Sequence, residues 1–441
     1  MTYTLIALLT IECALIFSWG LRQHERYLQF PILASAVFLG WIMPQFIGLT
    51  NFYGLPPGAL DKTILMAIFC LGAAYWGYVQ NRQPAKLFRW TFNRRRLLQG
   101  SAVLSLLGAF FFFKVGKLAA EAIDLYGGAW TGVITIYVFF SHMLTVGFAI
   151  ALILHLRRPS FGTWLIIGFG LIFYLERVFI AGRRAAMVEL FLMILFALWF
   201  NRRWAPPRST VIGAFIVGAL VINSAGDYRG TMLGEDRASW SGAGVEEILS
   251  IDFVGNLKRI VEGEAGGEEV RNAVLTIEAT DRQLSFDYGL STWNAFLHNY
   301  VPSQLVGTDF RTALTIDLED EAYREFGHVP WPGTTPTGLA DSFSSFWFIG
   351  AMKFFLIGYI LSRWYRAANE GNFVAQLVIM LTMGAALHAI THTTHHFFLV
   401  FIKLAAFTIP VLIYARVKRQ SHHQGVALQT RGIPARNAAA T

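Results

Sequence analysis

Arginine side chains gather at two points of a chain that is otherwise strongly apolar. Arg177, Arg183 and Arg184 fall within LERVFIAGRRAAMVEL beside Glu176, and Arg229 follows in SAGDYRG. A planar guanidinium group can bind a phosphate through two parallel hydrogen bonds. A charge at the depth of a bilayer costs about 2.5–3.5 kcal/mol, so ionisable residues in apolar segments point to function. We therefore interpret these arginines as an anion-binding site.

A simpler interpretation of the same arginines stays open. Their long side chains could extend to lipid headgroups, and Glu176 or Glu189 could form ion pairs with Arg177 and Arg184. These two arginines stand seven residues apart, so they would share one face of a helix if Gly182 does not break it. On a continuous helix the two guanidinium groups would therefore lie close together.

A run of histidines in HAITHTTHHFF is the second group of candidates. Spacings of three and four residues place most of them on one helix face; they are His388, His392, His395 and His396. The pattern is locally similar to the histidine boxes of membrane di-iron desaturases, but those enzymes need several boxes and the other histidines form none. A zinc site, a polar helix end without chemistry and a role beside an anionic substrate are the alternatives. In the last role a histidine could accept a proton or donate to a phosphate.

An acidic run near the middle of the polar segment is a third candidate; it consists of Asp317, Glu319, Asp320 and Glu321. Two acidic residues spaced as in a D-x-D motif can hold a divalent metal in enzymes that use sugar nucleotides. We instead favour a solvated acidic face for this run. The sequence contains no phosphate-binding loop, no G-x-S-x-G motif and no glycine fingerprint for a dinucleotide. We therefore assign neither a metal nor a cofactor.

Membrane-spanning helices must position these residues. The chain has 441 residues, 55% of them hydrophobic and 15% charged, with a mean hydropathy of +0.47. A soluble protein of this length could not cover its surface with so few charges. Apolar stretches of about 20 residues recur throughout. They predict an all-α polytopic fold with about eleven transmembrane helices, at 3–20, 28–48, 63–80, 97–116, 129–155, 161–180, 186–200, 209–224, 342–362, 373–391 and 397–415.

Basic residues in the short loops predict the orientation, because Lys and Arg stay on the cytoplasmic side. Loop 81–96 carries six of them, and Arg416, Lys418 and Arg419 follow the last helix. This puts the N-terminus in the periplasm and the C-terminus in the cytoplasm. The turn at 176–184 is the exception, since its arginines then face outward.

A polar segment separates two groups of helices. We expect helices 1–8 in residues 1–224, a periplasmic cap in 225–341, helices 9–11 in 342–415 and a disordered cytoplasmic tail in 416–441. Residues 225–340 contain 19 of the 28 acidic residues of the chain but only 8 of its 36 basic residues. The overall basicity is therefore an orientation signal and not a footprint of nucleic acid. Apolar spacing at 244–262 and 269–283 predicts a mostly helical cap.

Two stretches in and after the cap resemble a known family. Tyr288–Ser303 reads YGLSTWNAFLHNYVPS, and Gly338–Gly350 reads GLADSFSSFWFIG. They are similar to motifs of the Wzy-type O-antigen and exopolysaccharide repeat-unit polymerases, namely a Tyr-Gly before an apolar run ending in Ile-Pro-Arg, and a Glu-x-Tyr-x-Asn-Phe-Gly stretch that opens a helix. The matching residues are Tyr288, Gly289, Pro302, Asp341, Phe343, Phe346 and Gly350. Ser303, Ser345 and Trp347 stand where the family has arginine, asparagine and glycine.

The resemblance implies a membrane-embedded glycosyltransferase of the GT-C type in the inner membrane of a Gram-negative bacterium. Such a polymerase moves a growing glycan from undecaprenyl pyrophosphate onto a lipid-linked oligosaccharide repeat unit at the periplasmic face, with inversion. The leaving group departs readily, so one weak base suffices and no metal is required. The implied partners are these lipid-linked glycans and membrane lipids, with a chain-length-regulating copolymerase as a further candidate and no nucleic acid.

The resemblance also suggests roles for single residues. The pyrophosphate would be bound by Arg177, Arg183, Arg184 and Arg229. The base that accepts the hydroxyl proton would be Asp341 or one of His392, His395 and His396. The cap would contact the glycan through Tyr288, Trp293, Tyr300 and Pro302.

Three other functions stay open. An O-antigen ligase would share the architecture and the donor but would transfer the glycan to a lipid A core. A transporter or flippase of an anionic lipid-linked solute belongs to another class, and such proteins often show inverted repeats with broken helices in matching positions, which this sequence does not show. A structural role within a polysaccharide export complex is the third.

Overall fold

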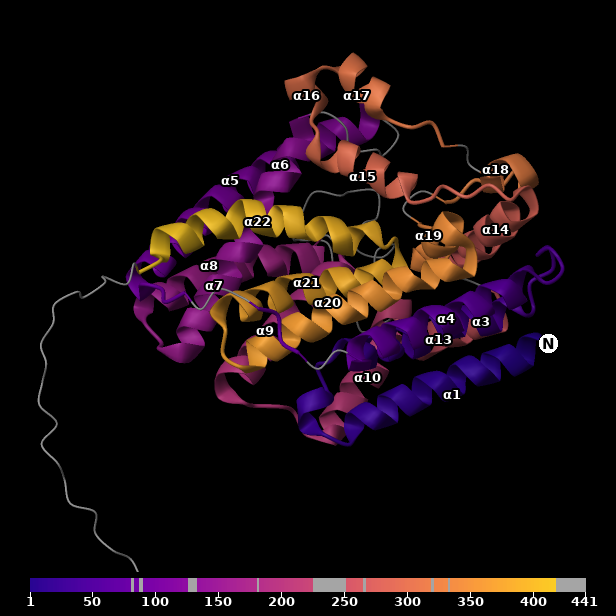
Figure 1. Ribbon diagram of the computed structural model, residues 1–441, viewed down its shortest axis with the longest axis horizontal. Helices are drawn as coiled ribbons and strands as arrows, with labels where there is room; N and C mark the ends of the chain where they lie inside the picture. Colours follow the sequence, from indigo (N-terminus) through magenta and orange to yellow (C-terminus); the bar gives the residue numbers. More distant parts are fainter. Residues whose placement is uncertain are drawn as a thin grey trace, which may run out of the picture.

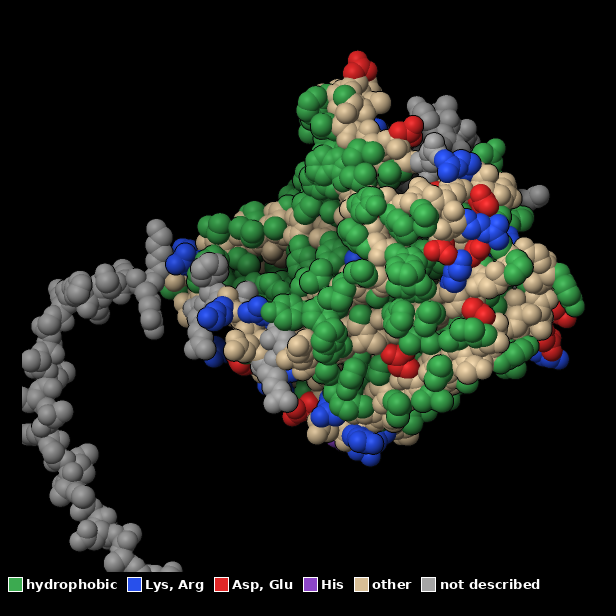
Figure 2. Space-filling model, turned by 45° about the vertical axis from the view of Figure 1, so that its right-hand side comes forward, with side chains coloured by type: hydrophobic (Ala, Val, Ile, Leu, Met, Phe, Trp, Pro, Cys, Tyr) green, Lys and Arg blue, Asp and Glu red, His purple; other side chains and the backbone are tan. Residues whose placement is uncertain are grey.

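Helices are the regular elements of the part of the chain that the computed structural model describes, which is residues 1–80, 83–86, 90–125, 133–180, 182–224, 251–264, 267–318, 321–331 and 334–417. Within these ranges ten helical segments are long and apolar enough to cross a membrane, and Arg208–Asn223 is a shorter apolar helix. The prediction of an all-α polytopic membrane protein is thus confirmed. Figure 2 shows hydrophobic side chains over most of the middle of the visible face. The tail from residue 418 onward lies outside the described residues.

The first group of helices follows the predicted positions with small breaks. In chain order its elements are α1 (Thr2–Leu21), η1 (His24–Arg26), α2 (Phe30–Val37), η2 (Phe38–Ile42), α3 (Met43–Leu49), α4 (Ala59–Gln80), α5 (Arg94–Leu125), α6 (Val133–Ser141), α7 (Met143–Arg157), α8 (Phe161–Leu175), η3 (Glu176–Ile180), α9 (Arg184–Arg202) and α10 (Arg208–Asn223). The helix expected at 28–48 consists of α2, η2 and α3, and the one expected at 129–155 consists of α6 and α7.

The second group carries the C-terminal crossings. Its elements are α19 (Thr337–Phe346), η4 (Trp347–Ala351), α20 (Met352–Asn369), α21 (Phe373–Thr391) and α22 (His395–Ala415). Asn372 begins α21 by accepting a hydrogen bond from the Ala375 N–H at 3.1 Å, which satisfies one of the free donors at a helix start. In Figure 1 α20, α21 and α22 run side by side with α4 and α1.

Glycines let α4 and α20 approach backbone to backbone. A Cβ atom added at Gly77 would lie 2.1 Å from the Phe355 carbonyl oxygen, and one at Gly358 would lie 2.3 Å from that of Ala74. Small residues at such contacts allow membrane helices to pack closely. This contact fixes α20, which follows directly after the segment that carries Asp341.

The segment between the two groups is helical where it is described. Its elements are α13 (Phe253–Glu262), α14 (Glu268–Gln283), α15 (Leu290–Tyr300), α16 (Ser303–Val306), α17 (Thr308–Leu314) and α18 (Glu321–Phe326). We call α14 to α18 the cap helices and the end of the bundle that they cover the cap end (Figure 1). Residues 225–250, with Arg229, Trp240 and the first part of the helix expected at 244–262, lie outside the described residues.

Charged residues attach the cap helices to the bundle. Lys62 of α4 forms ion pairs with Glu278 at 2.8 Å and with Asp281, both on α14. Arg282 also donates to Glu278 at 2.8 Å. At the opposite end, which we call the tail end, the Asn93 N–H donates to the Ala415 carbonyl at 2.8 Å. Different contacts are thus found at the two ends of the bundle, namely ion pairs to the cap helices at the cap end and a backbone hydrogen bond between distant segments at the tail end.

A sharp break interrupts the helix that the sequence predicts at 342–362. Trp347 ends α19 with φ 53° and ψ −146°, and a 3₁₀ turn then leads into α20. Gly350 lies against α19, where a Cβ atom would be 1.7 Å from the Ser342 carbonyl oxygen. Because of this fold-back, Asp341 is buried against both α20 and the turn between α21 and α22.

Candidate functional site

The four predicted histidines form one cluster where α21 ends and α22 begins. The rings of His388 and His392 stack with centroids 3.7 Å apart, and the His388 and His396 rings meet edge to face at 4.6 Å. The His395 ring lies 4.6 Å from that of His396. Three of the rings are half-buried and that of His396 is exposed. The sequence placed most of these residues on one helix face, whereas the structure divides them between the end of α21, the following turn and the start of α22, where their rings meet.

Asp341 lies beneath the turn that carries these histidines. Its Oδ2 accepts hydrogen bonds from the Thr394 backbone N–H at 2.9 Å and from the Thr394 hydroxyl. The Lys353 ammonium group lies 3.4 Å from the same oxygen and donates to the Ser345 hydroxyl at 2.7 Å. The carboxylate therefore fixes the start of α22, and its charge acts directly on His395.

The turn between α8 and α9 separates the arginines that a continuous helix would have aligned. The π-helical turn η3 ends at Ile180, Gly182 adopts φ 56° and α9 begins at Arg184. The Arg183 N–H donates to the Arg177 carbonyl at 3.0 Å, which closes the turn. Arg177 and Arg184 thus belong to different elements, because Gly182 breaks the helix.

Each of these arginines has different surroundings. The Arg177 guanidinium lies 5.8 Å from the centroid of the Tyr174 ring. Partial burial and then the like charge of Arg177 lower the pKa of the Arg183 guanidinium, while Glu176 opposes them. Arg184 donates to the Ile222 carbonyl at 3.1 Å and lies 3.9 Å from Glu269 of the cap helix α14. Arg184 therefore connects the bundle to the cap.

The pairing proposed for Arg184 differs from the one suggested by the sequence. Its acidic neighbour at 3.9 Å is Glu269 of α14. Glu189 stands five residues after Arg184 on α9 and therefore lies about 140° away around the helix. The charge of Arg184 also acts on His392. The fourth predicted arginine, Arg229, lies outside the described residues.

Lys403 is a charged residue that the sequence reasoning missed, and Glu189 entered that reasoning only as an ion-pair partner of an arginine. Lys403 is half-buried within α22, and its charge acts on Glu189 and on His396. Glu189 is half-buried on α9 and interacts electrostatically with Arg177 as well as with Lys403. No hydrogen bond or ion pair within 4.0 Å joins either side chain to another residue that the structure describes. A lone lysine inside the apolar run FFLVFIKLAAF was the available signal.

These charged groups make up what we call the cap-end cluster, which consists of Arg177, Arg184, Glu189, His388, His392, His395, His396 and Lys403. Its members come from η3, α9, α21 and α22. The cluster combines three basic side chains and one acidic side chain with four imidazoles. Such a site can bind an anion and can also transfer a proton.

The two stretches that carry the family resemblance meet in space. The Asp287 N–H donates to the Ser344 carbonyl at 2.9 Å, and the rings of Tyr288 and Phe346 lie 6.2 Å apart. Tyr288 adopts φ 51° and Gly289 φ 87°, so the chain turns here before α15. The proximity of these distant segments places the start of α15 beside α19, which carries Asp341.

The predicted glycan residues of the cap lie along and after α15. Trp293 is exposed and donates from its indole to the Leu314 carbonyl at 3.1 Å. Tyr300 donates to the Leu399 carbonyl at 2.8 Å, so it holds α15 against α22. Burial raises the pKa of the Tyr300 hydroxyl, which therefore stays a donor. Pro302 precedes α16. Tyr288 and Trp293 are available to a ligand, whereas Tyr300 has a structural contact.

Metal binding finds no support in the donor geometry of the described residues. No three His, Cys, Asp or Glu side chains among them are placed to hold one ion. In the acidic run, Glu321 accepts a hydrogen bond from the Ser285 hydroxyl at 2.9 Å, and residues 319–320 lie outside the described residues.

Comparisons of this chain with protein-family models, with curated proteins and with solved structures give no match. Function is therefore inferred from the chemistry of the site.

Proposed function

We propose that this protein is a polysaccharide polymerase, a glycosyltransferase that moves a growing glycan from undecaprenyl pyrophosphate onto a lipid-linked repeat unit. The observation that supports it best is the cap-end cluster. Arg177, Arg184 and Lys403 are half-buried there among apolar helices, where several cations close together are costly and an added anion stabilises them. A lipid pyrophosphate is an anion that sits at this boundary and carries several negative charges.

In this proposal the cap end faces the periplasm of a bacterial inner membrane. Basic residues that the structure describes at the tail end support this orientation, because Lys and Arg collect on the cytoplasmic side. They include Lys86, Arg94, Arg95, Arg96, Arg157, Arg158 and Arg416. The N-terminus would then be periplasmic and the C-terminus cytoplasmic.

The reaction forms one bond and breaks another. A hydroxyl at the non-reducing end of the acceptor attacks the anomeric carbon of the donor glycan, and the bond from that carbon to the pyrophosphate oxygen breaks. Arg177, Arg184 and Lys403 stabilise the negative charge that builds up on the leaving pyrophosphate. A histidine of the cluster takes the hydroxyl proton. Attack opposite the leaving group inverts the anomeric configuration.

We assign two different roles to the predicted bases. Asp341 uses its Oδ2 for Thr394 and Lys353, so we assign it as a positioning residue that fixes the histidine turn. The histidines themselves, with the exposed His396 at the margin, are the groups that can reach a substrate. Tyr288 and Trp293 would stack on sugar rings, as exposed aromatic side chains do.

The direct test is polymerisation by the purified protein. Synthetic undecaprenyl-pyrophosphate repeat units of the cognate polysaccharide are added in detergent or nanodiscs, and the products are separated by size. We expect a ladder of lipid-linked glycans and release of undecaprenyl pyrophosphate. Absence of both products with the cognate repeat unit would contradict the proposal.

A deletion strain distinguishes a polymerase from a ligase and from a flippase. Loss of a polymerase leaves single lipid-linked units on the periplasmic side, whereas loss of a ligase leaves full-length lipid-linked chains. Loss of a flippase leaves single units on the cytoplasmic side. Only the first outcome agrees with our proposal.

A further inference from the structure

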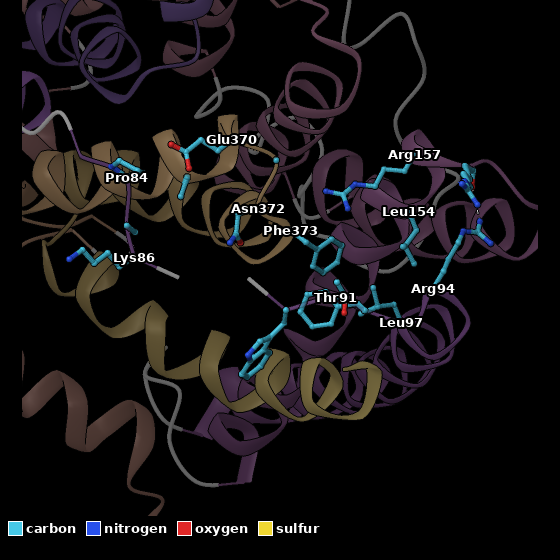
Figure 3. A pocket seen from close by; sticks show the side chains of 16 residues that line it. Pro84, Lys86, Thr91, Arg94, Leu97, Leu154, Arg157, Glu370, Asn372 and Phe373 are labelled. Carbon is cyan, nitrogen blue, oxygen red and sulfur yellow. Dashed lines mark hydrogen bonds between the residues drawn. The ribbon is translucent and has the colours of Figure 1, made fainter. Parts of the chain in front are cut away.

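A large cavity lies at the tail end, far from the cap-end cluster. Its volume is about 1130 Å³, and it opens between segments 84–86 and 90–97, the end of α7 and the turn that joins α20 to α21 (Figure 3). Ligand sites for small molecules commonly enclose about 300–1,000 Å³. The cavity is thus large enough for a ligand, and nothing in the function proposed above uses it.

Positive charge dominates the lining of this cavity. Among the lining residues that the structure describes, the basic ones are Lys86, Arg94, Arg157 and Arg158, and the acidic one is Glu370. Leu97, Leu154 and Phe373 supply apolar surface. A concave surface with one sign of charge concentrates oppositely charged ligands.

The Arg157 guanidinium is held in place by neutral groups. It donates to the Asn201 side-chain oxygen at 3.0 Å and to that of Gln376 at 2.8 Å. It also lies 5.3 Å from the centroid of the Phe373 ring, and Figure 3 shows the two side chains pointing toward one another. Since none of these partners is an anion, the charge of Arg157 is positioned but not neutralised by them.

Arg94 shows a similar arrangement on the other wall. One of its terminal nitrogens donates to the Arg158 carbonyl at 2.6 Å and to the Ser160 hydroxyl at 3.0 Å. Its Nε is buried and has no hydrogen-bond partner among the described residues. Arg94 is thus held on this wall by one terminal nitrogen, with a buried donor left unpaired at a cost of about 1–3 kcal/mol.

We propose that this cavity binds a phosphate ester whose organic part lies against Leu97, Leu154 and Phe373. Arg94, Arg157 and Arg158 contact the phosphate oxygens, as guanidinium groups prefer. Two sources offer this chemistry at a cytoplasmic membrane face, namely the headgroup of an anionic phospholipid and a soluble nucleotide. The proposal does not depend on the reaction assigned to the cap end.

The test uses the full-length protein in detergent, with phosphatidylglycerol and ADP as separate probes and phosphatidylcholine as the lipid control. Bound lipid is counted by native mass spectrometry, and ADP binding is measured by calorimetry. We expect one of the two anionic probes to bind with one-site stoichiometry. Binding of phosphatidylglycerol identifies the lipid source, and binding of ADP identifies the soluble one.

Three variants separate a specific site from general attraction to positive charge. Arg157→Gln and Arg158→Gln each remove a cavity cation, and we expect about tenfold weaker binding for each. Arg158→Gln removes no hydrogen bond recorded for its side chain, so loss of folding does not confuse the result. Arg95→Gln is the matched control, because Arg95 is exposed in the same turn of α5 as Arg94 and does not line the cavity. Equal weakening by the control, or no binding of either probe, would overturn the proposal.

Discussion

Lys403 carries its charge deep into an apolar helix. It stands eight residues after the first residue of α22, which is about two helical turns. An ammonium group at such a depth costs about 2.5–3.5 kcal/mol on the insertion scale. Its electrostatic neighbours Glu189 and His396 belong to the same cluster. Binding of the leaving group by Lys403 would offset the free-energy cost of placing its charge at this depth.

Substitution of Lys403 by methionine therefore separates function from stability. Methionine is unbranched, one atom shorter than lysine and uncharged, so we expect a thermal midpoint that is equal or higher. We expect the rate of polymerisation to fall at least about tenfold, because one charge contact to pyrophosphate is lost. Thermal unfolding and the size ladder measure the two effects. Lys258→Met, at an exposed position on α13, serves as the control, and normal polymer from Lys403→Met would remove Lys403 from the site.

Asp341 allows a test of position against chemistry. Asp341→Asn keeps an acceptor for Thr394 but loses the charge that attracts Lys353, and hydrogen bonds to charged groups contribute about 1.5–3 kcal/mol. We expect kcat to fall about tenfold with the shape of the pH–rate profile unchanged. A profile that loses its acidic limb in this variant would show that Asp341 is itself the base. His392→Gln is the comparison in which we expect the profile to change.

The residue types at the site were predictable from the sequence, but their partners were not. The spacing of the histidines predicted one shared helix face, but a turn at residues 392–394 divides them between α21 and α22, and their rings meet across that turn. The pairing of Arg184 with Glu269 instead of Glu189 could not be foreseen, because it depends on how α14 is placed. Lys403 was overlooked because a single lysine hardly changes the hydropathy of α22.

At the scale of elements, the fold-back from α19 to α20 decides where Asp341 lies. The apolar pattern at 342–362 predicts one helix, since hydropathy carries no information on backbone breaks. The structure instead turns at Trp347 and folds η4 against α19, so that Gly350 contacts the Ser342 carbonyl. Similarly, the sequence left open whether Gly182 breaks a helix, and its φ of 56° shows that it does.

A methyl group at Gly350 tests this fold-back. In Gly350→Ala the added Cβ would lie 1.7 Å from the Ser342 carbonyl oxygen, so η4 must move away from α19. Overpacking of this kind costs about 1–3 kcal/mol, and we expect a lower thermal midpoint together with reduced activity. Gly168→Ala on α8 is the control, because no heavy atom lies within 4 Å of its added Cβ. Equal stability of the two variants would mean that the contact at Gly350 is not as close as described.

At the scale of the whole molecule, the two ends have opposite chemical character. Arg95 and its neighbours at the tail end form an exposed basic surface, whereas the cap end combines acidic helices with the half-buried cations of the cap-end cluster. Both the polymerase proposal and the phosphate ester proposal require these ends to face different compartments. The sequence predicted that basic residues gather at one end. This prediction counts Lys and Arg in short loops, and the count hardly changes when helix boundaries are wrong by a few residues. The position of the cavity could not be predicted, since it lies between segments distant in sequence.

Labelling of single cysteines in intact cells tests the orientation. Cys13 and Cys70 are fully buried, so their background reaction with a membrane-impermeant maleimide should be small. Asp309 of α17 and Arg95 of α5 are both exposed, one at each end of the molecule. With the cap end in the periplasm, Asp309→Cys should react in cells whose outer membrane alone is permeabilised, and Arg95→Cys should react only after the inner membrane is opened. The reverse pattern would place the cap-end cluster in the cytoplasm, away from periplasmic lipid-linked glycans, and the polymerase proposal would have to be abandoned.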